Sequence, residues 1–399
     1  MDIVVTTTLK KPVKEYLHEV DFMRLFFIFG VILNHTINTI LSAMNGTDSA
    51  STTLQNIRLM FHYSRNGFLF MSGLVLTLNY FNRHDWKTFY RKRFSGSLWP
   101  YLTWNLIFLL LFSVIDQVQI SSTDFFVQYL NVIIHGSRFY MYYMLLVMQL
   151  YLIFPGIVWI FKKWPNHHLR ITAISLLIQV GLDALIKYKL QYIDLSSLPY
   201  WFRAFSINIF SYQFYFIFGA YVSLHYKDVY AFISKYIKII APTAIVLAFG
   251  TILYLREFNM NVLGLNYDLA TSPHQPYMQI FDVLMIITIF WVGKQYAAWR
   301  NNGIPLPIEW FVKNGAKVSF GIYLNQSIGL LILRILLSHL QLSNWGYFML
   351  IPIEYGLVIL ISFGLAWFCY KVAPFGFLIG RPQWHFHSLK LVWPLKKIE

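Results

Sequence analysis

The chain has 399 residues, of which 57% are hydrophobic and 12% are charged, and its net charge is +15. Several apolar runs reach or exceed the ~20 residues that a helix needs to cross a bilayer, so the chain is predicted to be a polytopic membrane protein. The single cysteine, Cys369, excludes an intramolecular disulfide and a cysteine-based metal cluster. The positive net charge requires no nucleic-acid partner, because Lys and Arg in cytoplasmic loops explain it.

Ten apolar segments are predicted to span the membrane as helices. The eighteen residues before the first segment are polar and contain no cleavage-site pattern, so this segment is predicted to be retained and not removed as a signal peptide. The loops are too short to fold as separate domains, which places all chemistry in or beside an all-α bundle. The predicted spans lie near residues 20–42, 64–82, 98–116, 139–161, 171–190, 206–224, 236–255, 279–296, 318–338 and 347–370.

The distribution of basic residues predicts the orientation of these spans. Alternate loops, counted from the N-terminus, contain twenty-three Lys and Arg residues, whereas the loops on the other side contain seven. Because positive loops stay in the cytoplasm, both termini are predicted to be cytoplasmic. The chain would then have a cytoplasmic segment over residues 1–19, a transmembrane domain over 20–370 and a cytoplasmic tail over 371–399. Its positive loops would attract anionic membrane lipids or a phosphorylated cofactor.

Two ionisable residues stand in the first apolar run, Arg24 and His35. Eleven residues are about three helical turns, so both side chains would project from nearly the same face, roughly 16 Å apart along the axis. Ionisable residues inside a spanning helix usually face a protein interior or a watery cavity, which makes the pair a candidate functional site. In the alternative interpretation, Arg24 marks the membrane interface and His35 only hydrogen-bonds to another helix.

Other ionisable residues offer weaker candidates. Arg65 precedes the second predicted span, where it would contact an anionic group of a glycan or only anchor a helix end. Asp183, Asp282 and Glu354 lie near the outer ends of predicted spans. Paired carboxylates there would suggest the proton relay of a transporter, but the sequence does not show which of them meet.

Five segments, in order along the chain, carry distinctive motifs: DFMRLFFIFGVILNH (21–35), RNGFLFMSGLVLT (65–77), FYRKRFSGSLWPYLTW (89–104), MYYMLLVMQLYLIFP (141–155) and SFGIYLNQ (319–326). The first segment places an Arg, ten residues and then a His in the first helix, and the third is a basic loop that runs into a Pro-containing helix. All five resemble segments of the bacterial membrane acyltransferase-3 family, and the fourth is most similar to Gram-positive polysaccharide-modifying members of that family.

The resemblance implies transfer of an acyl group, often acetyl or succinyl, from a cytoplasmic thioester donor to a glycan hydroxyl. His35 matches the catalytic His of the family and Arg24 its partner Arg. A neutral imidazole can take the proton of the attacking hydroxyl, or can carry the acyl group itself. Arg24 would hold a phosphate of coenzyme A by paired hydrogen bonds, and Asp21, one turn earlier, would pair with Arg24. No metal is expected.

The chain departs from the family pattern at two positions. Members often carry His after the Tyr-Leu of the late segment, where this chain has Asn325; an amide can still donate to an oxyanion or a sugar hydroxyl, but it cannot act as a base. The basic loop commonly reads Arg-x-x-Arg, and here Arg93 matches the first position and Gly96 the second. Arg91 and Lys92 would supply the missing charge, or would only belong to a solvated positive loop.

The sequence therefore predicts a membrane O-acyltransferase in the bacterial cytoplasmic membrane. Its donor would be acetyl- or succinyl-coenzyme A, and its acceptor an extracellular polysaccharide, a teichoic acid or a lipid-linked precursor. Arg24, Arg91 and Arg93 would bind the donor, and Arg65 and Asn325 the acceptor. One alternative is a transporter or flippase that exports the glycan without chemistry; another is a non-catalytic member of a polysaccharide synthase complex.

Overall fold

The computed structural model describes residues 16–46, 48–115 and 122–381. These residues form helices joined by short connections and contain no β-strand, which confirms the all-α prediction. The helices are α1 (His18–Leu41), α2 (Ser49–Leu59), α3 (Tyr63–Tyr80), α4 (Trp86–Ile115), α5 (Ser122–His135), α6 (Tyr142–Lys163), α7 (His168–Tyr188), α8 (Tyr200–Arg203), α9 (Gln213–Leu224), α10 (Tyr226–Ile252), α11 (Tyr267–Ala270), α12 (Pro276–Asn301), α13 (Leu306–Ser338) and α14 (Asn344–Lys371), with the short segments η1 (Pro165–His167), η2 (Leu190–Tyr192), η3 (Ile209–Ser211), η4 (Leu253–Val262) and η5 (Phe375–Ile379).

Each of the ten predicted spans corresponds to a helix. In the described part of the chain, eight helices are long and apolar enough to cross a membrane: α1, α4, α6, α7, α10 with η4, α12, α13 and α14. The two other predicted spans correspond to α3 and α9. With 12 residues, α9 is only about 18 Å long, which is shorter than the ~30 Å hydrocarbon core of a bilayer. The protein is therefore a multi-pass helical bundle in which α9 needs a packing partner.

Several helices begin before the predicted spans. α4 begins at Trp86, α10 at Tyr226 and α13 at Leu306, between ten and twelve residues earlier than hydropathy indicates. The basic stretch expected as a loop before the third span is thus the first turns of α4. Lys and Arg favour helix and can stay in water beyond the membrane, so apolar length alone places these helix starts too late.

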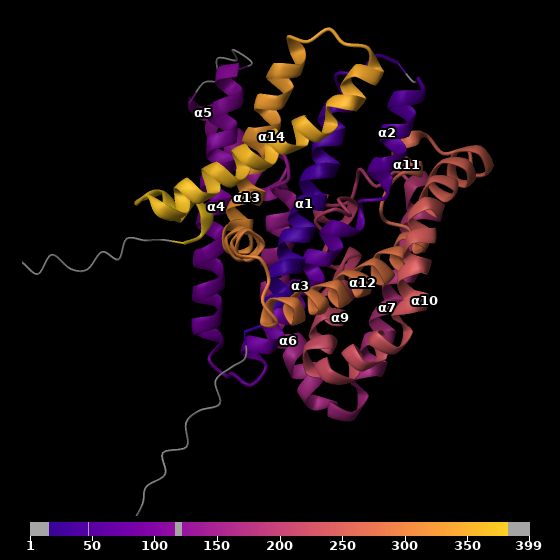
Figure 1. The fold of residues 1–399 in the computed structure, drawn as a ribbon, viewed down its shortest axis with the longest axis vertical. Coiled ribbons are helices and arrows are strands. Elements are labelled where there is room, and N and C mark those ends of the chain that lie inside the picture. Colours follow the sequence, from indigo (N-terminus) through magenta and orange to yellow (C-terminus); the bar gives the residue numbers. More distant parts are fainter. Residues whose placement is uncertain (1–15, 47, 116–121, 382–399) are drawn as a thin grey trace, which may run out of the picture.

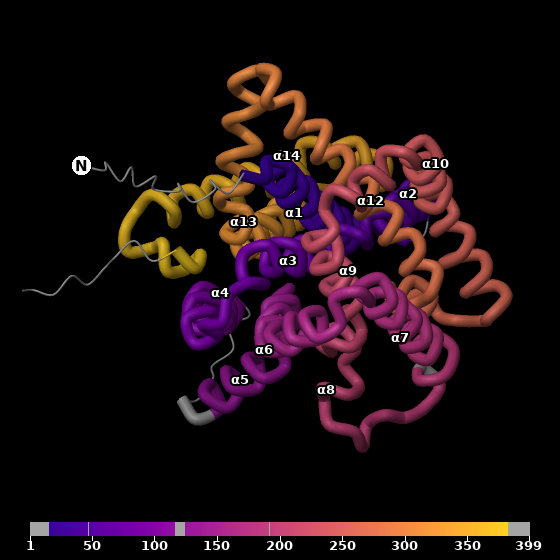
Figure 2. The backbone as a smooth tube through the Cα atoms, turned by 90° about the horizontal axis from the view of Figure 1, so that it is seen from below, coloured from indigo at the N-terminus to yellow at the C-terminus, as the bar shows by residue number. Residues whose placement is uncertain are grey.

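The helices surround α1. In Figure 1, α1 runs through the middle of the bundle, and α2 and α5 lie at the end of the molecule toward which α1 ends. Figure 2 shows α4 and α5 on one flank and α10 on the other, with α1 and α3 between them. α1 packs directly against α3, α12, α13 and α14. Polar residues on the faces of α1 that meet these helices are therefore placed in the interior of the bundle, whereas Asn38 near the end of α1 is exposed.

Two glycines bring α3 and α9 unusually close together. A Cβ added to Gly73 of α3 would overlap the backbone carbonyl oxygen of Phe216, and a Cβ added to Gly219 of α9 would overlap that of Phe70. Small residues at such crossings let helix backbones approach each other in a membrane. This contact fixes the short α9 against α3, which carries Arg65.

The close approach predicts a strong effect of a single methyl group. Gly219→Ala is expected to lower stability by about 1–3 kcal/mol, because neither backbone can move away without losing its packing. Gly181→Ala in α7 is the matched control, since a Cβ there meets nothing within 4 Å. Thermal unfolding of both purified variants in detergent measures the difference. Equal melting temperatures for Gly219→Ala and the wild type would show that α3 and α9 are not packed in this way.

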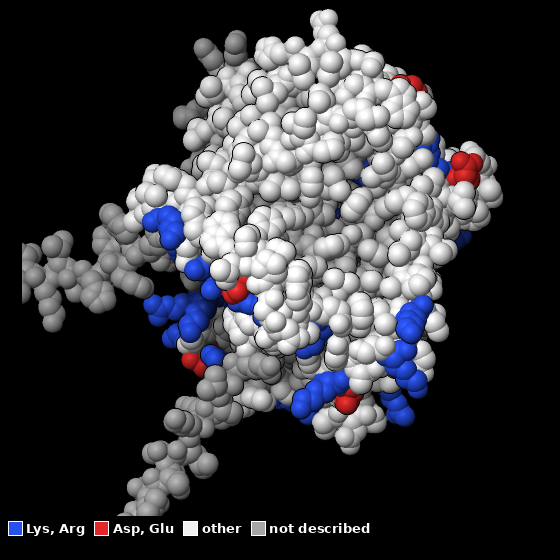
Figure 3. Space-filling model, viewed as in Figure 1, with Lys and Arg blue, Asp and Glu red and all other residues white. Residues whose placement is uncertain are grey.

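Charge is distributed unevenly between the two ends. On the face in Figure 3, most Lys and Arg side chains gather over the lower half, the end at which α1 begins. The predicted orientation can be tested by cysteine labelling in a chain whose native Cys369, which is buried, has been replaced by serine. Lys92→Cys and Lys313→Cys, both at exposed positions, are expected to react only from the cytoplasmic side, and Asp124→Cys only from outside. Labelling of residues 92 and 124 from one side would overturn the predicted topology.

Candidate functional site

α1 carries both residues that stand out in the first apolar run. Because α1 is a continuous helix, Arg24 and His35 lie about three turns apart, roughly 16 Å along its axis. Arg24 lines a cavity near the beginning of α1, and His35 lines a cavity nearer its end. The two side chains therefore face the interior of the bundle at two different depths.

The cavity around Arg24, named here the basic cavity, has a volume of about 420 Å³. It lies between α1, α3, α4, α6 and α13, and η5 and the residues after it close one side. Arg24 contacts Asp21, as expected, with 3.7 Å between Nη1 and Oδ1, and 31% of its side chain stays exposed. Among the residues that the structure describes, no Asp or Glu lines the cavity, so its excess positive charge suits a phosphorylated ligand. The cations that line it are Arg24, Lys92, Arg93, Lys317 and Arg381.

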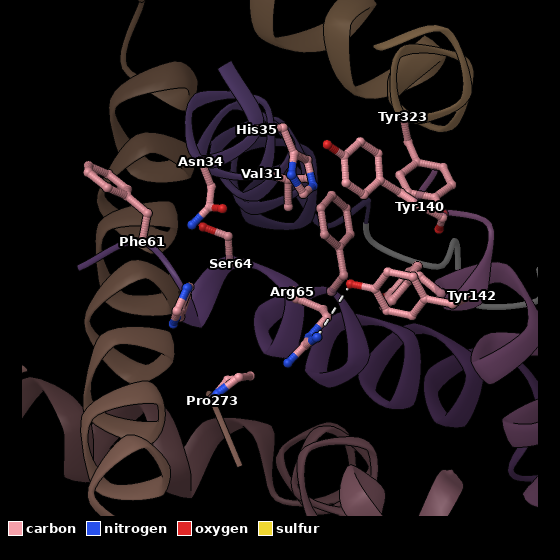
Figure 4. A pocket seen from close by; sticks show the side chains of 13 residues that line it. Val31, Asn34, His35, Phe61, Ser64, Arg65, Tyr140, Tyr142, Pro273 and Tyr323 are labelled. Atoms are coloured by element: carbon pink, nitrogen blue, oxygen red, sulfur yellow. Dashed lines mark hydrogen bonds between the residues drawn. The ribbon is translucent and has the colours of Figure 1, made fainter. Parts of the chain in front are cut away.

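The cavity around His35, named here the histidine cavity, has a volume of about 240 Å³. The ring of His35 stacks on Tyr140, with 3.5 Å between ring centroids and 22° between ring planes. The hydroxyl of Tyr323, from the Ser-Phe-Gly-Ile-Tyr-Leu segment of α13, donates a hydrogen bond to the backbone carbonyl of Tyr140. This bond holds Tyr140 beside His35. Figure 4 shows His35, Arg65 and Tyr142 reaching into this cavity from α1, α3 and α6.

Three aromatic residues line both cavities. Phe68 comes from α3, Tyr143 from α6 and Tyr323 from α13, and we name this group the neck. The rings of Tyr143 and Tyr323 lie 5.9 Å apart between centroids. The two cavities are therefore neighbours along α1, separated only by side chains. An apolar, narrow ligand arm suits such a constriction, whereas phosphate groups suit the basic cavity below it.

Arg65 presents a positive charge to the histidine cavity, and the carboxylates of Asp183 and Asp282 offset it only from beyond ion-pair distance. Its Nη1 donates to the hydroxyl of Tyr142 at 3.4 Å, and its guanidinium lies 4.8 Å from the ring centroid of Tyr212. None of the ion pairs found in the described residues involves Arg65. His62, three residues earlier, also lines this cavity. Burial, together with the positive charges of Arg58 and Arg65, lowers the pKa of His62 well below its ordinary value, so His62 is neutral at pH 7.

Two further cavities adjoin the histidine cavity. One of about 1000 Å³ shares Tyr140 with it, and one of about 540 Å³ shares Arg65 and Pro273. They lie toward the end of the bundle opposite the basic cavity, so His35 can be approached from that end. The polar and aromatic residues that line them include Asn38, Thr39, Ser42, Asn45, Arg334, Gln341, Tyr347, Tyr200, Arg203, Ser206 and His274.

The three carboxylates named as a possible proton relay do not line any of these cavities. Asp282 accepts hydrogen bonds from Asn66 at 2.5 Å and from Tyr215 at 3.1 Å, and Asp183 accepts one from Gln279 at 2.7 Å. These bonds tie α12 to α3, α7 and α9. Glu354 lies apart on α14, buried and without a hydrogen-bond partner in the described structure. A structural role fits the two aspartates better than a relay through the bundle.

The structure brings together some of the predicted site residues and leaves others apart. Arg24 and Arg93 share the basic cavity, and His35 and Arg65 share the histidine cavity. Arg91 is exposed and does not line the basic cavity. Asn325 is 1% exposed, its Nδ2 has no hydrogen-bond partner in the described structure, and it lines none of the cavities.

Sequence reasoning missed four residues of these cavities. His62 and Tyr140 line the histidine cavity, and Lys317 and Arg381 line the basic cavity. The spacing of His62 and Arg65, with two residues between them, was a usable signal, because His62 directly precedes α3 and Arg65 lies in its first turn. Nothing in the sequence indicated Arg381, which reaches the basic cavity only because the chain turns back after α14.

Comparisons with known proteins agree with this architecture. Residues 17–371 match the family model described as an acyltransferase domain, acyltransferase-3. The chain is 25% identical over 371 residues to proteins of Staphylococcus aureus strains MRSA252 and MSSA476, each named a probable poly-beta-1,6-N-acetyl-D-glucosamine export protein. These alignments cover 91% of this chain and 95% of each relative. No solved structure matches the chain.

Proposed function

The chain belongs to the acyltransferase-3 family and is an acyltransferase, and we propose that it moves an acetyl or succinyl group from cytoplasmic acyl-coenzyme A to a hydroxyl of a cell-envelope or extracellular polysaccharide. We place it in the bacterial cytoplasmic membrane. The junction of the basic cavity and the histidine cavity at the neck carries the proposal, because it provides a site for phosphates beside a site for a base.

The basic cavity would bind the phosphate groups of the donor. Arg24, Arg93 and Lys317 line it from three different helices, so they can contact a ligand with several phosphates from different sides. The flexible, narrow arm that ends in the thioester would extend through the neck toward His35. The separation of about three helical turns between Arg24 and His35 makes Arg24 a binding residue rather than a reacting group.

The histidine cavity would hold the reacting groups. The acceptor hydroxyl oxygen attacks the thioester carbonyl carbon, the carbon–sulfur bond breaks, and the new carbon–oxygen bond forms. His35 takes the proton of the hydroxyl and returns it to the departing thiolate. In the two-step form of the reaction, His35 first takes the acyl group from the donor and then passes it to the acceptor hydroxyl. Arg65, which forms no direct ion pair among the described residues, would stabilise the negative charge on the carbonyl oxygen.

The acceptor would arrive from the opposite end of the bundle. The cavities next to Tyr140 and Arg65 offer aromatic, amide and hydroxyl groups of the kind that bind sugars. The names of the staphylococcal relatives support a polysaccharide acceptor, because they concern a polymer of N-acetylglucosamine. Partners in such a process would include membrane lipids, the glycan or a lipid-linked precursor, and a polysaccharide synthase complex.

Mass spectrometry of envelope glycans tests this function. Polysaccharide from cells that contain the protein is expected to carry an acyl mass that disappears when the gene is deleted and returns when it is restored. An unchanged acyl content in the deletion strain would contradict the proposal.

Export of the polysaccharide without chemistry is the second candidate, and the relatives' names favour it. The two functions predict different results for the His35→Ala variant and for deletion of the gene. If the protein is an acyltransferase, His35→Ala should abolish acylation while polymer still reaches the medium. If it is an exporter, deletion of the gene should remove the polymer from the medium, whereas the acyl content of the remaining polymer should not change.

A further inference from the structure

The chain after α14 turns back onto α4. The indole Nε1 of Trp104 in α4 donates a hydrogen bond to the backbone carbonyl of Leu378 at 2.9 Å. The backbone N–H of Arg381 donates to the carbonyl of Gly376 at 2.8 Å, which closes the turn that follows η5. We name residues 372–381 the return segment. These contacts fix it against the helix that carries Lys92 and Arg93.

Two glycines allow the return segment to reach α4. Gly380 has a φ of +67°, and a Cβ added to it would overlap the backbone carbonyl oxygen of Gly96. Gly96 lines the basic cavity, so the backbone of the return segment lies at the cavity wall. Only a residue without a side chain fits at position 380, for both its conformation and its contact.

This contact places Arg381 at the basic cavity. Its guanidinium lies 5.7 Å from the ring centroid of Tyr370, and Nζ of Lys317 lies 4.8 Å from the same centroid. Two like charges thus lie around one ring, and no Asp or Glu among the described residues lines the cavity. An anion that binds between the two cations would be attracted by both of them.

We propose that the return segment is part of the donor site and that Arg381 binds a phosphate group there together with Lys317. The inference rests on the proposed function, since it assigns the phosphate to coenzyme A. A phospholipid headgroup carries the same chemistry, and the experiment below separates the two sources. Arg381 would add a charge from the C-terminal end of the chain to a site that α1, α4 and α13 otherwise build.

Coenzyme A affinity tests the proposal. Full-length protein is placed in nanodiscs of phosphatidylcholine alone, and coenzyme A is titrated into the wild type, Arg381→Ala and Arg381→Lys. The alanine variant is expected to bind at least about tenfold more weakly, because one charge-assisted contact is lost, and the lysine variant is expected to be intermediate. Lys371→Ala is the charge control, because Lys371 is a neighbouring cation that does not line the cavity; its affinity should stay unchanged.

A second pair of variants tests the geometry without removing the charge. Gly380→Ala should reproduce the loss in Arg381→Ala although Arg381 is still present, because the return segment can no longer contact Gly96. Gly264→Ala is the matched control: its φ is +66°, so the strain on the backbone is similar, but a Cβ there meets nothing within 4 Å. It should bind coenzyme A as the wild type does.

The outcomes distinguish this inference from the proposed function. Wild-type affinity in both Arg381→Ala and Gly380→Ala overturns the inference alone. Arg381→Ala could instead keep its affinity for coenzyme A and lose the contact that the wild type makes with phosphatidylglycerol in nanodiscs containing this lipid. In that case the phosphate belongs to a lipid, and the assignment of Arg381 to the donor site is wrong. A wild-type protein that does not bind coenzyme A overturns the proposed donor and this inference with it.

Discussion

Replacement of His35 by alanine is expected to lower acyl transfer by about two to four orders of magnitude, the range that loss of one general base typically produces. His35 lines the histidine cavity at the neck, where a thioester that passes from the basic cavity would arrive. The neighbouring imidazole of His62 belongs to a different segment and does not replace His35 on its helix face. The measurement is the rate of acyl transfer to polysaccharide by purified protein, with membrane insertion checked in the same preparation.

Two controls make this result specific to chemistry. His135→Ala removes a partly exposed imidazole that forms a hydrogen bond with the backbone carbonyl of Asn131 and a ring contact with Tyr200, so its rate should equal that of the wild type. His35→Gln keeps a polar group beside Tyr140 but offers no base, so it should be as inactive as the alanine variant. A near-normal rate for either His35 variant would exclude a catalytic role for His35 and favour export of the polysaccharide as the function.

Replacement of Arg24 is expected to weaken donor binding by about ten- to a hundredfold, which corresponds to the loss of one or two charge-assisted hydrogen bonds. Arg24 faces the basic cavity, and its partner Asp21 lies at 3.7 Å and leaves 31% of the Arg24 side chain exposed. Arg24→Ala should lose the affinity for coenzyme A. Arg24→Lys should also bind weakly, because an ammonium cannot reproduce the planar paired geometry.

The Arg24 series separates a binding residue from an interfacial anchor. If Arg24 only marks the membrane interface, lysine should serve as well as arginine, since both extend a charge on a long apolar stem. Arg170→Ala, at an exposed position that lines none of the cavities, is the matched control. Unchanged affinity in both Arg24 variants would exclude Arg24 from the donor site, and a defect in alanine alone would leave it as a simple positive charge.

The sequence predicted the part of the fold that depends on local patterns. Apolar length located a helix at each of the ten predicted spans, and the spacing of Arg24 and His35 placed both on one face of α1, because these features are properties of a single helix. The sequence could not predict that α9 is too short to span the membrane alone. The contact that holds α9 in place depends on Gly73 of α3, which lies in a different helix.

The cavities were less predictable than the helices. Their walls combine residues from five helices and the return segment, and no local pattern shows which of these segments meet. Arg91, two residues before Arg93, was expected to supply the missing charge of the basic loop. Because that stretch is helical, Arg91 points away while Arg93 lines the cavity, and Arg381 contributes from nearly three hundred residues later.

In the proposed reaction, the acyl group passes through the neck from a donor on one side of the membrane to an acceptor on the other. Proteoliposomes with uniformly oriented protein test this passage directly when labelled acyl-coenzyme A is supplied only on the side of the basic cavity and polysaccharide only on the opposite side. We expect label in the polysaccharide, and none when His35 is replaced by alanine. Label that appears only when donor and acceptor share one compartment would exclude passage through the neck.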